Sequence, residues 1–489
     1  MNSKERIAAL VLTALYLVPI WLYPVFPTQD GPSHLYNSVI FSDLLWSSEG
    51  FFHKVYEINW APFPNWTFTL LSSLMYPLLP IEQVEKVVLS IYLVSFIGAI
   101  FYLVRSFDTE KTVIGFAGFL FAYNWFLWMG FYNFCLSLPL VLVTIGFAIR
   151  HRGFVYGQRL YLLMLMFLLL YFSHLVSFAL TMGVLTLMFA GFGQKRGRAL
   201  RQLLIAAAPA LALFGIYYFA QPHSSATLYW APGEYLAATF FSFKIGPWFN
   251  AWETVWLVAF WLVMGTWVFL TWRQFRDWGD EERSWWLVVA GTASLCIAMP
   301  NNLLGGTSLN ERLAIFVGLF MLVTLSLKRW TFPKWWLGAA LAVLVVAQLL
   351  YIHLVIRDWN RQLEPFQQLG RRIAHNSKVL PLIYADNVVG FFANPLLHAD
   401  AIALAESHSV SPCNYEGFTG YFPVRYKSKS IIPVPDEWYK PDAFIECDLV
   451  KHYDYVIAWK ATQSRLEAPA FSKFTQVYAS GDLVLLKHR

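Results

Sequence analysis

The chain has 489 residues, of which 57% are hydrophobic and only 13% are charged. Soluble domains average about 45–50% apolar and about 25% charged residues, so this composition excludes an ordinary soluble protein and predicts a polytopic α-helical membrane protein. The formal net charge of +6 does not indicate nucleic-acid binding, because the basic residues are scattered through short loops and form no patch. We therefore expect membrane lipid as a partner and no nucleic acid.

The first hydrophobic segment, 7–26, follows the short charged prefix Lys4-Glu5-Arg6 and contains no small-residue cleavage site. It is expected to be a retained membrane span and not a removed signal peptide. Almost directly after it comes the stretch Thr28-Gln29-Asp30-Gly31-Pro32-Ser33-His34-Leu35-Tyr36. Because proline suits the first turn of a helix, a helix is predicted from this point to about Trp46.

Asp30 then lies at or beside the N-cap of that helix, and His34 lies on the same face one turn later. An acidic residue at the mouth of a membrane span is costly to desolvate, so it is either wetted and incidental or held there for chemistry. One interpretation is that Asp30 only caps the helix and His34 only contacts headgroups. The other is that both belong to a reaction site.

The apolar segment 67–79 has only about two-thirds of the roughly 20 residues that a spanning helix needs. If it does not cross, the cytoplasmic loops hold 17 basic residues and the outer loops hold 4. The inner residues are Lys4, Arg6, Arg105, Lys111, Arg150, Arg152, Arg159, Lys195, Arg196, Arg198, Arg201, Arg273, Arg276, Arg283, Lys328, Arg329 and Lys334, and the outer ones are Lys54, Lys86, Lys244 and Arg312. Because the positive-inside rule favours this arrangement, we expect one long outer loop, 27–83, with surface-lying helices.

Ten further segments are predicted to cross the membrane, which makes about 11 spans with the first. They are 84–104, 113–129, 131–149, 160–173, 175–192, 203–220, 252–272, 285–299, 313–327 and 335–356. The transmembrane domain is thus assigned to 1–356. A cytoplasmic N-terminus and an odd number of spans place the C-terminus outside, as in a multi-pass protein of the bacterial inner membrane with a periplasmic or extracellular C-terminal domain.

From about Arg357 the composition becomes that of a soluble domain, 357–489. The segment 362–375 has apolar Leu363, Phe366, Leu369 and Ile373 at helical spacing. The segments 378–384 and 454–459 indicate strands, and 474–487 indicates a hairpin that turns at Gly481-Asp482. A small extracytoplasmic α/β domain is therefore expected.

The chain has four cysteines, too few for a disulfide framework. Cys135 and Cys296 lie in hydrophobic segments and are expected to be small apolar fillers. Cys413 and Cys447 lie in the C-terminal domain and could form one disulfide in an oxidising compartment, but the sequence gives no distance between them.

The predicted layout has five parts in chain order. These are a retained first span, an acidic residue just beyond it, an outer loop of surface helices, some ten further spans and an extracytoplasmic C-terminal domain. This layout resembles the GT-C class of membrane glycosyltransferases, which includes the protein O-mannosyltransferases and the lipid A aminoarabinose transferase. Within that class the chain is similar to bacterial membrane proteins that carry an Asp-Gly-Pro-x-His stretch after the first span. The resemblance implies transfer of a sugar from a polyprenyl-phosphate carrier to a glycan, lipid or protein acceptor on the outer face.

By this resemblance Asp30 matches the acidic residue that accepts the proton of the acceptor hydroxyl, and His34 would orient Asp30 or contact the carrier phosphate. The departing phosphate needs a cation. Arg312 is the candidate, because it opens a predicted span at its outer end after a polar approach that ends in Asn310-Glu311. The alternative is an interfacial arginine paired with Glu311. Lys244, in a long outer connection, is a second phosphate candidate.

Three residues of short outer turns, His174, Tyr132 and Asn133, could face the same cavity and hydrogen-bond sugar hydroxyls. A plain turn role is the alternative for each. No phosphate-cradling glycine motif of the Walker or dinucleotide type is present, so ATP-driven chemistry is not expected. No cofactor is assigned, and the lipid-linked sugar donor is a substrate. The doubly acidic pair of the protein O-mannosyltransferases is also absent, and no metal-ligand set follows Asp30, so a divalent metal is not assigned.

Two other functions compete with sugar transfer. A transporter or flippase for a lipid-linked or polar substrate would place ionisable residues near the bilayer midplane and would often show inverted repeats. Here the hydrophobic segments hold almost no charges, and no repeat is evident. A non-catalytic envelope assembly protein would tolerate loss of Asp30 but not of the C-terminal domain.

Overall fold

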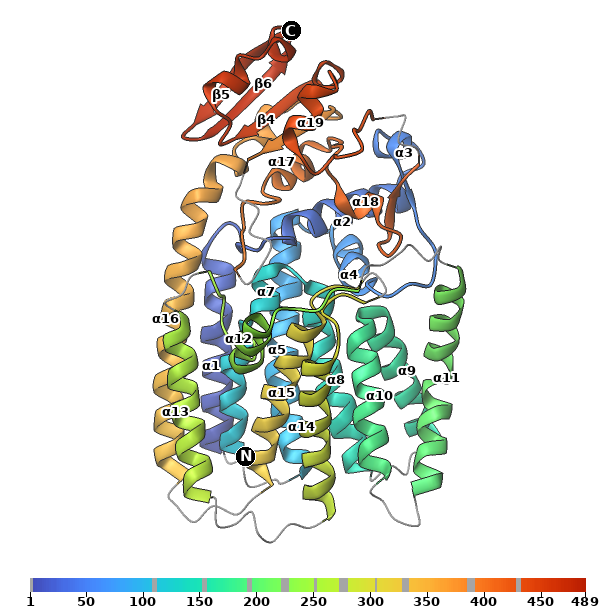
Figure 1. Ribbon diagram of the computed structural model, residues 1–489, viewed down its shortest axis with the longest axis vertical. Coiled ribbons are helices and arrows are strands. Elements are labelled where there is room, and N and C mark those ends of the chain that lie inside the picture. The colour runs from blue at the N-terminus through green and yellow to red at the C-terminus, as the bar shows by residue number, and fades with distance from the viewer. Residues whose placement is uncertain are drawn as a thin grey trace.

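The computed structural model describes residues 3–107, 112–151, 156–190, 196–220, 228–249, 253–271, 280–303, 306–327, 334–384, 392–427 and 432–489. Seven of the basic inner-loop residues counted above lie outside these ranges: Lys111, Arg152, Lys195, Arg273, Arg276, Lys328 and Arg329. A bundle of helices carries a smaller C-terminal domain at one end, and the N-terminus lies at the opposite end (Figure 1). The end of the bundle that contacts the C-terminal domain is here called the domain face.

In the part of the chain that the structure describes, helices occupy every segment that the sequence predicts to be a span. The bundle and its first loop contain α1 (Ser3–Leu22), α2 (Gly31–Trp46), α3 (Phe52–Val55), α4 (Thr67–Met75), α5 (Ile81–Phe107), η1 (Thr112–Gly118), α6 (Phe119–Ala122), α7 (Trp125–Met129), α8 (Tyr132–Arg150), α9 (Gln158–Ser173), α10 (Leu175–Ala190), α11 (Arg196–Ala220), α12 (Gly233–Ser242), α13 (Thr254–Thr271), α14 (Asp280–Ala298), α15 (Leu309–Ser326) and α16 (Lys334–Gln367).

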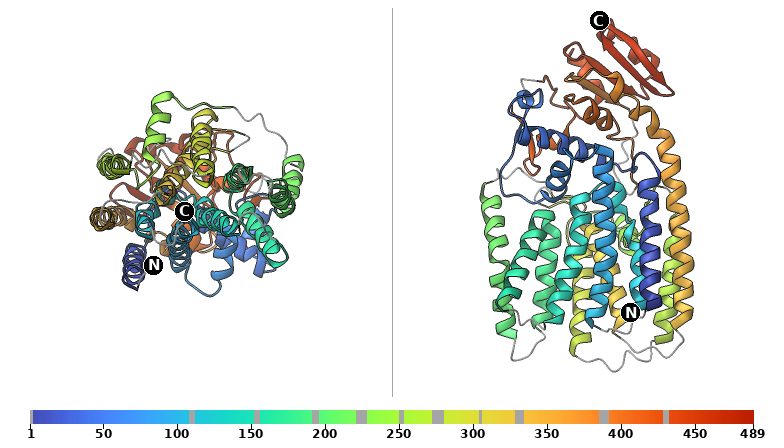
Figure 2. Two further views of the ribbon diagram at one scale, coloured as in Figure 1. Left: turned by 90° about the horizontal axis from the view of Figure 1, so that it is seen from below. Right: turned by 180° about the vertical axis from the view of Figure 1, so that it is seen from behind.

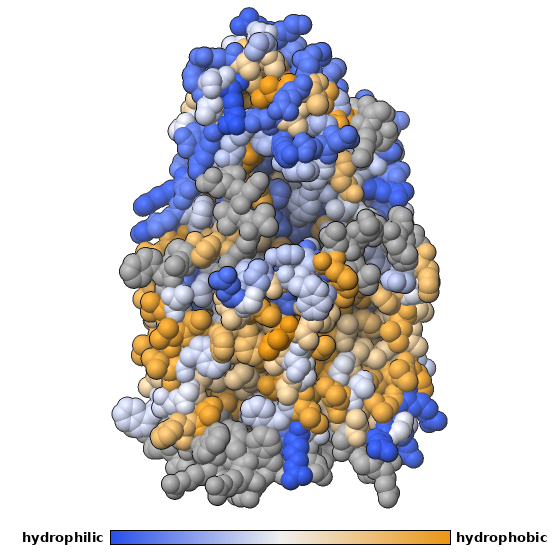
Figure 3. All heavy atoms as spheres, in the orientation of Figure 1, coloured by the Kyte–Doolittle hydropathy of each residue, from blue (hydrophilic) through white to orange (hydrophobic). Residues whose placement is uncertain are grey.

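Six helical stretches in the described ranges are long and apolar enough to cross a membrane: Ser3–Leu22, Ile81–Phe107, Thr112–Met129, Tyr132–Arg150, Arg196–Phe219 and Trp336–Arg372. Three shorter apolar helices accompany them: Gln158–Ser173, Leu175–Ala190 and Thr254–Thr266. On the face seen in Figure 3, apolar residues dominate the middle of the bundle, whereas hydrophilic residues dominate the C-terminal domain. A multi-pass membrane protein is therefore supported, and the count of eleven crossings stays a prediction.

The first loop does not run through the bundle. Its helix α4 has nine residues and therefore rises about 14 Å, less than half of the roughly 30 Å hydrocarbon core. The predicted helix after Asp30 is confirmed as α2, which lies across the domain face (Figures 1 and 2). All its residues from Gly31 to Ser42 are buried. Burial on every side shows that α2 is enclosed between the bundle and the C-terminal domain.

The predicted division at residue 357 is not a break in the helix. The last helix, α16, runs without interruption to Gln367, beside α1 and onward into the C-terminal domain (Figures 1 and 2). The helical spacing over 362–375 corresponds to the end of α16 as far as Gln367 and to the short helix η5 (Gly370–Arg372) after it. The change of composition marks where the helix leaves apolar surroundings, because Leu363, Phe366 and Leu369 stay buried in the core of the domain.

The C-terminal domain is built on a four-stranded sheet of order β2-β4-β6-β5. Its elements are β2 (Val379–Ile383), α17 (Asp400–Ser407), α18 (Tyr415–Phe418), β3 (Val424–Tyr426), α19 (Pro441–Glu446), η6 (Val450–His452), β4 (Tyr455–Trp459), α20 (Gln463–Leu466), η7 (Pro469–Phe471), β5 (Phe474–Ser480) and β6 (Leu483–His488). Strands β2 and β4 are parallel and the other pairs are antiparallel, so both predicted strands and the predicted hairpin are present. All four cysteines are free, so Cys413 and Cys447 form no disulfide.

The first loop is part of the C-terminal domain's structure. Strand β1 (Tyr56–Ile58) pairs antiparallel with β3, and Tyr36 and Val39 of α2 belong to the same hydrophobic core as the sheet. The side-chain amides of Asn37 and Asn414 each donate to the other's oxygen at 2.9 Å. Because buried polar groups are costly when unpaired, these contacts fix the domain on α2. The domain is thus packed against the residues that follow Asp30.

Candidate active site

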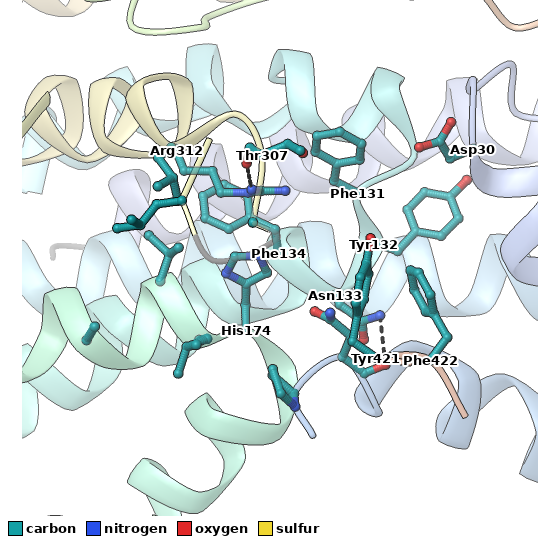
Figure 4. A pocket seen from close by; sticks show the side chains of 18 of the residues that line it. Asp30, Phe131, Tyr132, Asn133, Phe134, His174, Thr307, Arg312, Tyr421 and Phe422 are labelled. Atoms are coloured by element: carbon teal, nitrogen blue, oxygen red, sulfur yellow. Dashed lines mark hydrogen bonds between the residues drawn. The ribbon is translucent and has the colours of Figure 1, made fainter. Parts of the chain in front are cut away.

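A cavity of about 450 Å³ lies between the helix bundle and the C-terminal domain. Six predicted site residues line it: Asp30, His34, Tyr132, Asn133, His174 and Arg312. Figure 4 shows Asp30 at one end of the cavity and Arg312 with His174 toward the other, with Phe131 and Tyr132 between them. A carboxylate and a guanidinium that are 282 positions apart in the sequence therefore share one cavity.

Asp30 occupies the N-cap position of α2 but makes no side-chain capping hydrogen bond. The alternative in which Asp30 only caps the helix is therefore not supported. Its backbone N–H instead donates to the carbonyl oxygen of Met129 at 3.1 Å, and the N–H of Gln29 donates to that of Trp128 at 3.0 Å. These bonds hold the start of α2 against the turn that ends α7, while the carboxylate is left facing the cavity.

Gly130 is required in that turn for two reasons. Its φ of +79° is a left-handed conformation, and a Cβ atom would lie 2.4 Å from the backbone nitrogen of Gly31. Only glycine adopts such a position without strain. The close approach of the two backbones at Gly130 and Gly31 thus sets the position of Asp30.

We expect Gly130→Ala to destabilise the folded chain by about 1–3 kcal/mol, the usual cost of a strained left-handed residue, and to lower the midpoint of thermal unfolding in detergent. Gly98→Ala is the matched control, because a Cβ there would meet nothing within 4 Å. It should change stability by no more than about 1 kcal/mol. Equal thermal-unfolding midpoints for Gly130→Ala and Gly98→Ala would contradict the close approach of the backbones at Gly130 and Gly31.

The carboxylate of Asp30 is largely withdrawn from solvent, with 15% of its side chain exposed. Burial raises its pKa to about 6, while the charge of His34 and a hydrogen bond from Gln29 act in the opposite direction. That bond, from the Gln29 amide to Oδ1, is 3.2 Å long, and Nε2 of His398 lies 3.8 Å from the same oxygen. A carboxylate in this state is ionised at neutral pH and still basic enough to accept a proton.

His34 forms an ion pair that the sequence did not predict. Its Nδ1 lies 3.0 Å from Oε1 of Glu416, which also accepts the hydroxyl of Ser33 at 3.1 Å. Burial by itself lowers the pKa of His34, but Glu416 and Asp30 outweigh it and the pKa is raised. The imidazolium form is therefore stabilised one helical turn from Asp30.

Arg312, in the first turn of α15, has a guanidinium that is buried without a carboxylate. One of its nitrogens donates to the carbonyl of Thr307, and its carbon lies 5.1 Å from the ring centre of Phe131 and 5.6 Å from that of Phe134. Within the described ranges Nε has no hydrogen-bond partner and no carboxylate lies within ion-pair distance. A buried cation in this condition is costly unless an anion binds to it.

Glu311 and Lys244 do not line the cavity. Glu311 accepts the hydroxyl of Tyr235 at 2.5 Å, and its charge acts on Arg312 without a direct ion pair between the two side chains in the described part of the chain. Lys244 follows α12 with a left-handed φ of 51°, and its ammonium lies 4.4 Å from the ring centre of Trp125. The chain therefore turns Lys244 toward Trp125 and away from the cavity, which corrects its assignment as a second phosphate ligand in this site.

Tyr132 and Asn133 line the cavity, but their polar atoms already have protein partners. The Tyr132 hydroxyl donates to Glu85 at 2.5 Å and lies 2.9 Å from the hydroxyl of Thr28. The Asn133 amide accepts from the N–H of Phe68 at 2.8 Å and donates to the carbonyl of Asn65 at 3.1 Å. These contacts support positioning of the first loop and of Asp30, in place of the predicted hydrogen bonds to sugar hydroxyls.

His174, in the turn between α9 and α10, packs edge-on against Phe134 with ring centres 5.0 Å apart. Burial and the nearby charge of Arg312 lower its pKa well below the usual value, so the ring is neutral. Its Nδ1 has no partner among the described residues. A neutral imidazole and the guanidinium of Arg312 thus present polar nitrogens at the same end of the cavity.

The C-terminal domain supplies residues that sequence analysis missed: His398 and Glu416 beside Asp30 and His34, and Tyr415, Tyr421 and Phe422 in the cavity wall. No local pattern indicates them, because their role depends on a contact with α2 nearly four hundred positions earlier. Among the described residues no group of three or more His, Cys, Asp or Glu side chains could hold a metal ion.

No family model and no curated protein sequence matches this chain. Ten chains of solved structures match it, and the following two do so along nearly the whole length. The crystal structure of ArnT from Cupriavidus metallidurans in the apo state has a TM-score of 0.58 at 10% identity and covers 99% of this chain and 96% of its own. The structure of that ArnT bound to undecaprenyl phosphate has a TM-score of 0.61 at 10% identity, with coverage of 99% and 98%. The chain therefore has the fold of ArnT, which confirms the predicted GT-C-type architecture.

Proposed function

We propose that the protein is a membrane glycosyltransferase that moves a sugar from a polyprenyl-phosphate carrier to an acceptor hydroxyl. The observation that carries this proposal is the shared cavity of Asp30 and Arg312, a proton acceptor and an anion-binding group in one enclosure. The fold of an ArnT that binds undecaprenyl phosphate supports the choice of carrier.

The transfer needs a base because an alcohol is a poor nucleophile. In the proposed step the acceptor oxygen attacks the anomeric carbon while the carboxylate of Asp30 takes the hydroxyl proton. A new carbon–oxygen bond forms to the acceptor. A positioned carboxylate typically accelerates such a step by about 10²–10⁴-fold.

The bond from the anomeric carbon to the phosphate oxygen breaks in the same step, and its electron pair stays on that oxygen. Polyprenyl phosphate leaves with an additional negative charge. Arg312 and the neutral imidazole of His174 lie at the end of the cavity away from Asp30 and would bind this phosphate (Figure 4). A guanidinium in a dry site stabilises such charge more strongly than one in water.

The test is a transfer assay in proteoliposomes that contain the purified chain. The donor is a mixture of undecaprenyl-phosphate-linked sugars labelled in the phosphate group, membrane lipids serve as acceptors, and labelled undecaprenyl phosphate is counted as the product. We expect product to form with the chain and not in empty liposomes. No product from any of the linked sugars would contradict the proposal.

The rate of transfer should also depend on pH through the ionisation of Asp30. Because burial raises the pKa of this base to about 6, the proton-accepting form is populated above that pH and lost below it. The rate should fall about tenfold for each pH unit below the pKa. A rate that stays constant from about pH 7 down to about pH 5 would contradict a base of this kind.

A further inference from the structure

A buried ion pair joins the C-terminal domain to the helix that starts at Asp30. Glu416 of α18 contacts Nδ1 of His34 through Oε1 at 3.0 Å, and their side chains are 0% and 7% exposed. The other oxygen, Oε2, has no hydrogen-bond partner within the described ranges. Burying an ionised carboxylate this completely costs desolvation free energy, and a nearby positive charge has to offset that cost.

That positive charge is the imidazolium of His34. The ring is also packed among the aromatic side chains of Phe68, Tyr132 and Phe422, with ring centres 5.7 to 6.0 Å away. Such surroundings favour a neutral imidazole. Glu416 reverses this preference, and the charge that it stabilises lies one helical turn from Asp30.

We propose that Glu416 is a positioning residue of the transfer site, which keeps His34 protonated beside Asp30 and thereby keeps the Asp30 carboxylate ionised. The inference rests on the proposed function in assigning Asp30 as the base. It gives the C-terminal domain a role in the reaction: the domain completes the electrostatic surroundings of a residue that belongs to the first loop.

The other titratable groups around Asp30 do not supply this charge. Burial and the charge of His34 lower the pKa of His398 to about 4, so His398 is neutral. Burial raises the pKa of Tyr415 and of Tyr421, so both stay un-ionised. Tyr132 donates its hydroxyl to Glu85, and Arg312 lies toward the other end of the cavity (Figure 4).

Glu416→Gln tests the proposal, because glutamine keeps the size of the side chain and removes its charge. His34 should then lose its proton near neutral pH, and Asp30 should lose the positive charge that most strongly lowers its pKa. The direct repulsion between Glu416 and Asp30 also disappears, but it is the weakest of the influences on Asp30. In a plot of transfer rate against pH, the acidic limb is the low-pH part, where the rate falls as Asp30 becomes protonated. This acidic limb should therefore move to higher pH by about one unit or more.

Three further variants make this result specific. His34→Gln should move the acidic limb in the same direction. The double variant should move it no further, because each substitution removes the same positive charge, that of the His34 imidazolium. Glu416→Asp keeps the carboxylate and should restore much of the original profile. Glu406→Gln changes an acidic residue of α17 that pairs with exposed Arg371, and it should leave the profile unchanged.

Histidine protonation provides a readout that does not depend on transfer. Histidine-selective isotope labelling and NMR in detergent would follow the imidazole signals against pH, with His34→Gln assigning the signal of His34. In the unmodified chain His34 should titrate above its ordinary pKa of 6.5. In Glu416→Gln it should titrate below that value.

The two measurements separate the possible failures. An unchanged titration of His34 in Glu416→Gln, or an acidic limb that stays in place or moves to lower pH, would overturn the role of Glu416. If the unmodified chain transfers no sugar, the proposed function fails, and the titration still decides whether Glu416 holds the charge on His34.

Discussion

Asp30→Asn is expected to reduce sugar transfer by about 10²–10⁴-fold, the contribution of a positioned general base. Asparagine has nearly the same size, so the backbone bond from the N–H of residue 30 to the carbonyl of Met129 should persist. What it loses is the capacity to take a proton from the acceptor hydroxyl. The measurement is the initial rate of release of labelled undecaprenyl phosphate in proteoliposomes.

Asp43→Asn is the matched control, because Asp43 lies on the same helix and does not line the cavity. It should retain the rate of the unmodified chain. The Asp30 variant should also bind undecaprenyl phosphate as the unmodified chain does, which shows that it is folded. Transfer that survives in Asp30→Asn would remove Asp30 as the base.

Arg312→Gln is expected to weaken the binding of undecaprenyl phosphate by about 10- to 100-fold, since a hydrogen bond to a charged group contributes about 1.5–3 kcal/mol. The guanidinium already lies at the cavity, and the nearby carboxylate of Glu311 does not line it. The dissociation constant would be measured in nanodiscs at two salt concentrations. Because Arg312 is buried, the affinity should depend less on salt than a surface contact would.

Arg361→Gln provides the comparison. Arg361 lies in α16, is 71% exposed and pairs weakly with Asp358. It should bind undecaprenyl phosphate with unchanged affinity. Equal affinities of the Arg312 variant and the unmodified chain would show that the phosphate binds elsewhere.

Sequence analysis predicted the helices and strands whose ends are set by neighbouring residues. Pro32 after Asp30 indicated where α2 begins, and the alternation and turn residues of 474–487 indicated the terminal hairpin. Arg312 was recognised because a basic residue in an outer loop is exceptional in a chain whose basic residues are predicted to lie mostly on the cytoplasmic side. These signals identified both ends of the cavity before its shape was known.

Residues whose role depends on distant contacts were not predictable in the same way. Glu416 lies in the four-residue helix α18 and His398 in a turn, and nothing in the neighbouring sequence shows that they contact His34 and Asp30. Tyr132 and Asn133 were recognised as cavity residues, but the partners that occupy their polar atoms come from α5 and the first loop. The continuity of α16 was missed because a polar composition was interpreted as the end of a helix.

The most direct test is a cryo-EM structure of the chain in nanodiscs saturated with undecaprenyl phosphate. We predict the phosphate inside the cavity that Asp30 lines, with its oxygens about 2.7–2.9 Å from the guanidinium of Arg312, the usual length of a charge-assisted hydrogen bond. A carrier phosphate bound outside this cavity, or an empty cavity at saturating lipid, would contradict a sugar-transfer site in which Asp30 is the base and Arg312 binds the phosphate.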